Sequence, residues 1–311
     1  MKQSTKGLIM VLISGLVFGC VPGVVSFCYS QGARPELFVF SRYFALTLVL
    51  LPFMIRKKGL FQLYKRHFWL FLGLSALSIA TPLLLYIVYQ FLATSIATTI
   101  HFLYPALVAV ISVVFLKEKL SRLRLISVIL CGVGILLIME FGGKITLPGI
   151  LMAAASAVTW ASYIILLSRL KDPEIKSEHV LFFLAINCLA MITLVVLVDG
   201  ALVDCIEHMS GLGWLATALM GLGTAVFGVG FFAIGVRKTD AQIAAIASTL
   251  EPITCIAVGV LFLGETVTVR TAIGSVLILT AVVLLTLPEK KTKEPETPAA
   301  EAETDAEAPT S

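Results

Sequence analysis

The chain has 311 residues, of which 59% are hydrophobic and only 14% are charged. Soluble globular domains carry about 25% charged residues, so this composition excludes an ordinary soluble protein and indicates an all-α polytopic membrane protein. The net charge of +4 reflects membrane topology, and no nucleic-acid partner is expected.

Long apolar runs, each close to the roughly 20 residues that a helix needs to cross a bilayer, follow one another along the sequence. The first is too long for the apolar core of a signal peptide, and no small-x-small cleavage site follows it. We therefore interpret it as the first helix of the fold. The runs predict ten transmembrane helices, at residues 7–29, 36–55, 68–90, 93–116, 122–140, 148–169, 179–198, 212–236, 240–263 and 269–287.

The positions of the lysines and arginines orient these helices. Nineteen of the 23 lie at the N-terminus, in the loops after every second helix or at the start of the C-terminal tail, whereas three lie on the opposite side and Arg42 lies inside the second run. Positive residues concentrate in cytoplasmic loops. The sequence therefore predicts a multi-pass membrane protein with both termini in the cytoplasm. The composition of residues 289–311 predicts a disordered cytoplasmic tail.

Six cysteines occur, mostly inside apolar runs, and none forms a CxxC pair. Isolated cysteines of this kind pack as small apolar residues. We expect no metal site, no disulfide framework and no cofactor.

An internal repeat becomes visible when the chain is shifted by 147 residues. Pro105 then falls on Pro252 and Glu118 falls on Glu265, and ten positions within residues 96–130 are identical. Leucine and isoleucine matches are common between apolar helices, but the paired proline and glutamate are not. We expect each glutamate to close its helix pair near the membrane surface.

The first helices of the two halves match as well, with Phe18 aligned to Trp160. The chain is therefore expected to consist of two five-helix repeats, at residues 1–143 and 144–288. An odd number of helices per repeat means that the second repeat enters the membrane upside down. Inverted repeats of this kind alternate access to a site near the bilayer midplane.

The sequence LKE at 116–118 and LGE at 263–265 close the fourth and ninth runs, each of which carries a mid-helix proline. With ten helices in two halves, this pattern resembles the EamA branch of the drug/metabolite transporter superfamily over roughly residues 7–287. The resemblance implies a polytopic inner-membrane transporter, often an exporter of amino acids or other small metabolites. One departure is Lys117, where the second copy has the more usual Gly264.

A carboxylate stands at the centre of the ninth run, in the stretch STLEPIT. A charged side chain there costs about 2.5–3.5 kcal/mol on insertion scales, so intramembrane acids usually serve a substrate or a proton. Glu251 shares a small, weakly polar helix face with Ser248. Pro252 and Pro105 each free the carbonyl four residues earlier, at Ser248 and His101, so we expect loose backbone acceptors at one depth.

These observations predict a substrate cavity near the midplane. Glu251 is the expected partner of a substrate ammonium group and the expected proton-coupling residue, and the aromatic rings can stack on an apolar group or hold a cation. Each assignment has an alternative. Glu251 could be a protonated residue that only packs, and His101 could be an interior histidine whose hydrogen bonds are all made within the protein. The aromatic residues could form a belt at the membrane interface. The predicted substrate-binding residues are Tyr86, His101, Tyr104, Trp160, Tyr163, Ser248 and Glu251.

Two further features are an arginine inside an apolar run, whose role the sequence leaves open, and a row of glycines, which concerns helix packing alone. Arg42 lies about 10 Å inside the second run, where it either snorkels to the interface, holds the structure together or binds an anion. Gly15, Gly19 and Gly23, at four-residue spacing, predict close packing of the first helix.

Together these features predict a secondary transporter that exports a small metabolite, an amino acid or a related amphiphilic amine, by alternating access coupled to protons. The expected partners are the small-molecule substrate, membrane lipid and the coupling proton. A facilitative uniporter or channel-like permease without proton coupling is the first alternative. An intramembrane enzyme is the second, but the sequence has no HExxH, GxSxG or Walker motif.

Overall fold

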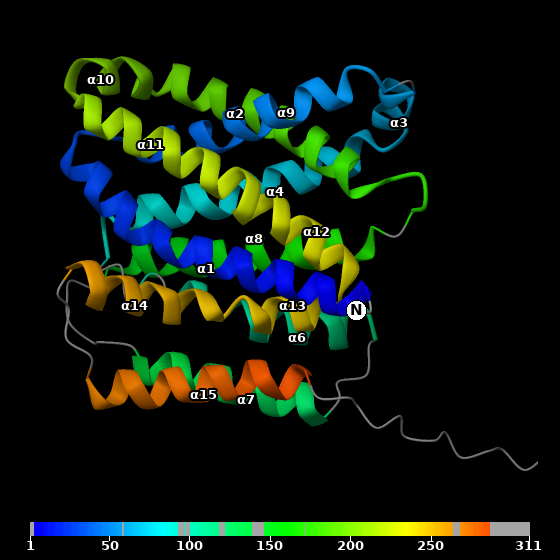
Figure 1. Cartoon of the computed structure of the whole chain (residues 1–311), viewed down its shortest axis with the longest axis vertical. Coiled ribbons are helices and arrows are strands. Elements are labelled where there is room, and N and C mark those ends of the chain that lie inside the picture. The colour runs from blue at the N-terminus through cyan, green and yellow to red at the C-terminus, as the bar shows by residue number, and fades with distance from the viewer. Residues whose placement is uncertain are drawn as a thin grey trace, which may run out of the picture.

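The computed structural model of the protein describes residues 3–57, 59–92, 97, 100–117, 122–138, 146–170, 172–263 and 268–286. Within these ranges the secondary structure is helical and contains no strand, which confirms the predicted all-α class. Long helices run side by side along one direction, and the start of α1 and the end of α15 lie at the same end of the bundle (Figure 1). Such a parallel arrangement is the one expected of helices that cross the same membrane.

The first half of the chain contains α1 (Gln3–Ser30), α2 (Pro35–Met54), α3 (Leu60–Arg66), α4 (Phe68–Val88), α6 (Tyr104–Val114) and α7 (Arg122–Ile138). The second half contains α8 (Leu147–Arg169), α9 (Ser177–Val198), α10 (Ala201–His208), α11 (Gly211–Gly223), the π-helix η1 (Thr224–Gly230), α12 (Phe231–Lys238), α13 (Ala241–Ala247), α14 (Leu250–Leu263) and α15 (Val269–Thr286).

Six helical segments are long and apolar enough to cross a membrane, and they coincide with six of the ten predicted runs. The other four runs contain α6, α7, α13 with α14, and α15, which are short, interrupted or next to residues outside the described ranges. Ten crossings therefore stay a prediction. The six segments are Ser4–Ser30, Pro35–Met54, Phe68–Val88, Leu147–Arg169, Ser177–Val198 and Gly211–Lys238.

Several sequence predictions fall outside the described residues. These are the start of the fourth run, the closing roles of Glu118 and Glu265, and the tail at 289–311.

The helix boundaries follow from local sequence. Arg34 is extended, with φ −108° and ψ 153°, and Pro35 occupies the first turn of α2, where its missing N–H has no helical partner to lose. The preceding turn needs Gly32, which has φ +85° and lies so close to His208 that a Cβ would stand 2.7 Å from the His208 carbonyl oxygen. Only glycine adopts this backbone and allows this approach at no cost.

The helix contacts repeat between the two halves. α1 packs against α12 and α14, whereas α8 packs against α4 and α6; α2 packs against α9, and α7 packs against α15. Each contact has a counterpart when α1 is matched to α8, α4 to α11–α12, and α6 to α14. In Figure 1 the α2–α9 pair and the α7–α15 pair form opposite edges of the bundle, with α1 and α8 between them.

Of the three regularly spaced glycines in α1, Gly19 makes the closest approach. A Cβ at Gly19 would lie 2.4 Å from Cβ of Thr254 and 2.6 Å from the carbonyl oxygen of Glu251. At Gly15 and Gly23 the nearest atoms would be at 3.7 and 3.6 Å, which is ordinary van der Waals contact. The predicted close packing of helix one is thus confirmed at Gly19, which brings α1 against the backbone of Glu251.

Candidate functional site

A cavity lies among α1, α2, α4, α8, η1, α12 and α14. Both halves of the chain contribute to its wall, and mostly apolar and aromatic side chains surround a few polar groups, as is usual for small-molecule sites. The lining residues are Phe18, Val21, Pro22, Arg42, Tyr43, Ser78, Thr81, Pro82, Leu85, Tyr86, Tyr89, His101, Trp160, Tyr163, Val229, Phe232 and Glu251.

Trp160 is the centre of an aromatic stack in this wall. Its ring stacks with Tyr163, at 5.2 Å between centroids and 15° between planes, and with Phe232, at 4.8 Å and 25°. Phe18 and Tyr104 meet the Trp160 ring nearly at right angles, both at 6.5 Å. α8 places Trp160 and Tyr163 three residues apart, on one face. The stack offers a flat apolar surface to a bound molecule.

Arg42 lies in the same cavity and is buried, with 4% of its surface exposed. Its Nε donates to Oγ1 of Thr224 at 3.2 Å, and its Nη2 donates to the hydroxyl of Tyr86 at 2.6 Å. Its guanidinium carbon lies 5.5 Å from the ring centroid of Phe18. Arg42 therefore does not snorkel to the membrane surface. Of the three alternatives that the sequence left open, the structural and anion-binding roles remain.

The π-helix η1 positions part of this wall. It interrupts the otherwise α-helical span Gly211–Lys238 in the middle of its length. Thr224 at its start reaches Arg42, and Val229 near its end lines the cavity. Single π-turns inside α-helices are frequent at functional sites. The matching helix of the first half, α4, has Pro82 at its cavity face.

His101 is held in one tautomer by its neighbour. The hydroxyl of Ser156 donates to the carbonyl oxygen of Ala153 at 2.6 Å, so its oxygen accepts from Nδ1 of His101, which lies 3.0 Å away. A neutral imidazole protonated at Nδ1 has an acceptor lone pair at Nε2. His101 is itself among the residues that line the cavity.

Glu251 lies just after a break in the ninth run. α13 ends at Ala247 and α14 begins at Leu250, and in the fourth run a turn likewise precedes α6, which begins at Tyr104. Glu251 keeps a partly exposed surface although it lies deep in the bundle, because it faces the cavity that it lines. Broken helices with polar groups at one depth are the arrangement found around transporter binding sites.

The prediction that the carbonyl group of Ser248 is free is wrong. Its oxygen accepts a hydrogen bond from the backbone N–H of Glu251 at 3.0 Å. The chain turns tightly between α13 and α14, so a bond to the third residue replaces the bond that Pro252 removes. The Ser248 hydroxyl donates to the carbonyl oxygen of Ala244 at 2.8 Å. Ser248 therefore satisfies its polar groups within its own segment.

The structure brings most of the predicted site residues together. Tyr86, His101, Trp160, Tyr163 and Glu251 line the cavity. Tyr104 and Ser248 are buried beside the lining residues rather than among them.

Other lining residues were not predicted from the sequence. Phe232 and Val229 line the cavity but lie in an apolar run, in which no polar residues distinguish the cavity face of the helix from the lipid face. Phe18 had a signal, because it aligns with Trp160 in the repeat. The two rings contact each other in the structure.

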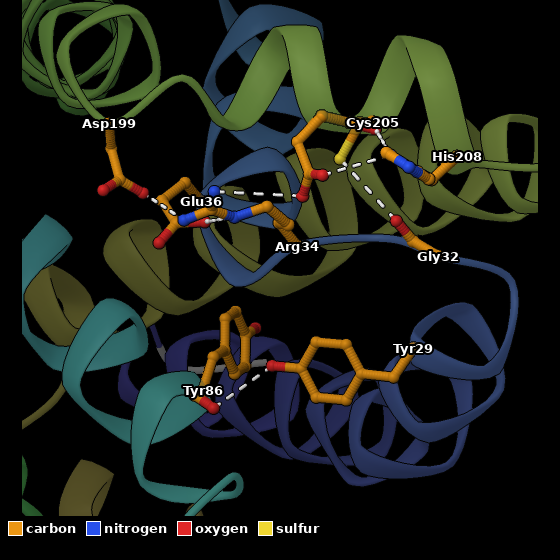
Figure 2. Close-up of polar contacts among 9 residues, drawn as sticks. Tyr29, Gly32, Arg34, Glu36, Tyr86, Asp199, Cys205 and His208 are labelled. Atoms are coloured by element: carbon orange, nitrogen blue, oxygen red, sulfur yellow. Dashed lines mark hydrogen bonds and ion pairs between the residues drawn. The ribbon is translucent and has the colours of Figure 1, made fainter.

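Ion pairs join the two halves at one end of the bundle, at the start of α2 (Figure 2). Arg34 pairs with Asp199, and its Nε lies 3.4 Å from a carboxylate oxygen of Glu36. His208 Nδ1 lies 3.1 Å from a carboxylate oxygen of Asp204, which lies 3.9 Å from Arg34. This cluster ties the start of α2 to the end of α9 and to α10.

A hydrogen bond joins Tyr86, which lines the cavity, to Tyr29 near this end of the bundle. The hydroxyl of Tyr29 donates to the carbonyl oxygen of Tyr86 at 3.1 Å, as Figure 2 shows. At the other end of α2, Lys57 pairs with Glu178 in the first turn of α9. Ion pairs therefore link α2 and α9 at both of their ends.

Comparisons with known proteins place the chain among transporters. The model of the EamA-like transporter family matches residues 5–140 and again residues 147–287. "Uncharacterized transporter YvbV" of Bacillus subtilis (strain 168) is 27% identical over 212 residues, which are 66% of this chain and 67% of that protein. An "Uncharacterized transporter" of Archaeoglobus fulgidus is 26% identical over 194 residues, 62% of this chain and 66% of that protein.

A solved structure titled "Crystal structure of protein" shares the fold, with a TM-score of 0.70 and 19% identity over 90% of this chain and 97% of that chain. The family match covers nearly the whole sequence in two copies, and the relatives are named as transporters rather than enzymes. The chain belongs to the EamA-like transporter family of the drug/metabolite transporter superfamily.

Proposed function

We propose that the protein is a secondary transporter that exports a small amine-bearing metabolite across the bacterial inner membrane by alternating access. One observation carries this proposal: a cavity lined by both copies of the family domain has Glu251 and an aromatic stack in its wall. A charged carboxylate without a partner is costly inside a membrane, so Glu251 is expected to bind either an ammonium group or a proton. The aromatic faces then cover the apolar part of the substrate.

The proposed architecture is ten crossings in two inverted repeats, at residues 1–143 and 144–288, with both termini in the cytoplasm. Its support is the charge distribution, the repeated helix contacts and the position of both ends of the described chain at one end of the bundle. Repeats related by an axis in the membrane plane allow the inward and outward states to have similar structures.

In the proposed mechanism, Glu251 binds either the substrate ammonium group or a proton. A proton that enters from outside neutralises the carboxylate and releases the amine, so export of the substrate is coupled to proton uptake. His101 and Tyr86 supply hydrogen-bond groups around the bound molecule, and Trp160 with Tyr163 covers its apolar part. Facilitated transport without proton exchange is the alternative, in which Glu251 is only a ligand.

The test is flux in reconstituted vesicles with L-phenylalanine as the probe, because it has an amine and a ring that fits the stack. Glu251→Gln keeps the shape and hydrogen bonding of the side chain but does not ionise. The variant should lose the response of flux to a pH gradient and lose at least about tenfold in flux, since a charge-assisted bond contributes about 1.5–3 kcal/mol.

Glu207→Gln is the matched control, because Glu207 is an exposed carboxylate on α10, away from the cavity. It should transport as the wild type does. Full pH response in Glu251→Gln would mean that Glu251 is a packing residue. A wild-type flux that does not respond to a pH gradient, combined with lower flux in Glu251→Gln, would favour the uniporter, in which Glu251 is only a ligand.

A further inference from the structure

The cavity contains a buried cation as well as a carboxylate. Among the described residues, no acidic side chain forms an ion pair with Arg42, although 96% of its surface is removed from solvent. An unpaired charge in a membrane interior is costly, and such residues mark the path of a substrate or an ion. The structural role of Arg42 therefore leaves its charge unexplained.

The hydrogen bonds of Arg42 use only part of its donor capacity. A guanidinium group has five N–H donors in a flat fork. Nε is used by Thr224 and Nη2 by Tyr86, whereas Nη1 has no hydrogen bond within the described part of the chain. Both partners are neutral and belong to η1 and α4, on two sides of the arginine. They fix the plane of the fork and leave one edge of it for a ligand in the cavity that Arg42 lines.

The fork suits a carboxylate in particular. Arginine binds carboxylates through two parallel N–H···O bonds, with a geometry that a lysine does not offer. The second charged group of the cavity, Glu251, comes from α14 rather than from α2, and within the described part of the chain no ion pair joins it to Arg42. A molecule with one negative and one positive group would pair both buried charges at once.

We propose that Arg42 binds the carboxylate of the substrate, so that the transporter selects small zwitterions with an apolar side chain and rejects the corresponding simple amines. This inference rests on the proposed function, in which Glu251 binds the amine. The substrate then lies between α2 and α14, with its apolar group against the stack formed by Trp160, Tyr163 and Phe232. Tyr86 and Thr224 are positioning residues for the guanidinium group.

Three probes that differ by one group test this assignment. L-Phenylalanine has both charges, phenethylamine lacks the carboxylate, and 3-phenylpropionate lacks the amine. Binding to the purified protein is measured by calorimetry, and flux is measured in vesicles. The wild type should prefer phenylalanine over each of the other two by about 10- to 100-fold, the range expected for the loss of one charge-assisted contact.

Variants then assign each preference to a residue. Arg42→Gln should lose the preference for phenylalanine over phenethylamine while it keeps the preference over 3-phenylpropionate; Glu251→Gln should do the reverse. Arg42→Lys keeps the charge without the fork and should retain part of the preference. Tyr86→Phe should weaken phenylalanine binding more than phenethylamine binding, because the hydroxyl positions the guanidinium group that binds only the carboxylate. A merely structural role of the hydroxyl would weaken both equally.

Arg66→Gln is the control, because Arg66 is an exposed arginine at the end of α3 and lies outside the cavity. A monodisperse elution profile and an unchanged helical spectrum are required of every variant, and Arg42→Lys replaces Arg42→Gln if the latter does not fold. Equal binding of phenethylamine and phenylalanine by the wild type would overturn the role of Arg42 and leave the proposed function standing. Failure of all three probes to bind or move would overturn both.

Discussion

At the scale of single residues, Lys117 has a backbone conformation that its side chain disfavours. It follows α6 with φ +53°, in the left-handed region, and its aligned partner in the second repeat is Gly264. The first repeat therefore keeps the backbone of a glycine helix end with an L side chain. A left-handed conformation costs about 1–2 kcal/mol for such a residue, and glycine removes most of this cost.

Lys117→Gly should therefore stabilise the protein by up to about 1 kcal/mol, after the larger entropy of the unfolded glycine is subtracted. The measurement is the midpoint of thermal unfolding in detergent. Lys117→Ala is the control, since it removes the same exposed charge but keeps the disfavoured conformation, and it should not raise the midpoint. Equal midpoints for the two variants would show that the strain is not relieved by glycine.

The residues that the sequence alone identified are those that differ from their surroundings. Glu251, His101 and Trp160 are polar or large residues in apolar runs, and all three line the cavity. Arg42 was equally visible, but the sequence does not say whether a long side chain turns toward lipid headgroups or toward the protein interior. Phe232 was not found, because a phenylalanine in an apolar helix gives the same pattern whether it faces lipid or a cavity.

At the scale of helices, the approach of α1 to α14 depends on the absence of a side chain at Gly19. A Cβ at Gly19 would overlap Thr254 and the backbone of Glu251. Since the backbone of α14 lies directly against α1, an added methyl group has to displace one of the two helices. The depth and direction of Glu251 are thus tied to this contact.

Gly19→Ala should destabilise the protein by about 1–3 kcal/mol and reduce flux through displacement of Glu251. The matched control is Gly73→Ala in α4, where a Cβ would meet no atom within 4 Å. Alanine is the better helix former by about 0.8–1.0 kcal/mol, so Gly73→Ala should be neutral or stabilising. Equal effects of the two substitutions on unfolding and flux would contradict the close contact of α1 with α14.

The helix breaks before α6 and α14 and the π-helix η1 are the features that the sequence did not predict correctly at this scale. The sequence located the prolines at residues 105 and 252, but it suggested carbonyl groups without partners, and the structure closes the gap at Ser248 with a shorter backbone bond. The π-helix η1 had no signal at all. One extra residue in a turn changes the direction of the following side chains, and a uniformly apolar run such as 212–236 does not reveal that change.

At the scale of the whole molecule, the proposed inverted topology makes a direct prediction. Reporter domains fused after Lys117 and after Arg270 should lie on opposite sides of the membrane, the first in the cytoplasm and the second outside. The physical reason is the asymmetry of 19 against three positive residues in the two sets of loops. Paired fusions to a reporter active only in the cytoplasm and a reporter active only outside give the measurement.

A fusion after residue 6 serves as the reference for the cytoplasmic side in the same cells. Detection of both test fusions on one side would remove the inverted repeat and, with it, the proposed alternation between two similar states.

The architecture as a whole was more accessible to sequence reasoning than the site, because it depends on sums over many residues. Run lengths, loop charges and the repeat each average over a whole helix, so errors at single positions cancel. The match of the family model to both halves of the chain, at 5–140 and 147–287, agrees with the repeat seen in the sequence. The wall of a cavity, in contrast, depends on the rotation of each helix, which apolar composition does not specify.

The position of Trp160 has a spectroscopic consequence. The chain contains three tryptophans, and the other two, Trp69 and Trp214, are 80% and 36% exposed on the outside of the bundle. Replacing both with phenylalanine leaves an indole that stacks on Tyr163 and Phe232 in the cavity wall. Its emission then comes from the cavity wall alone. The transporter thus has a natural fluorophore that reports occupancy of the cavity without any attached label.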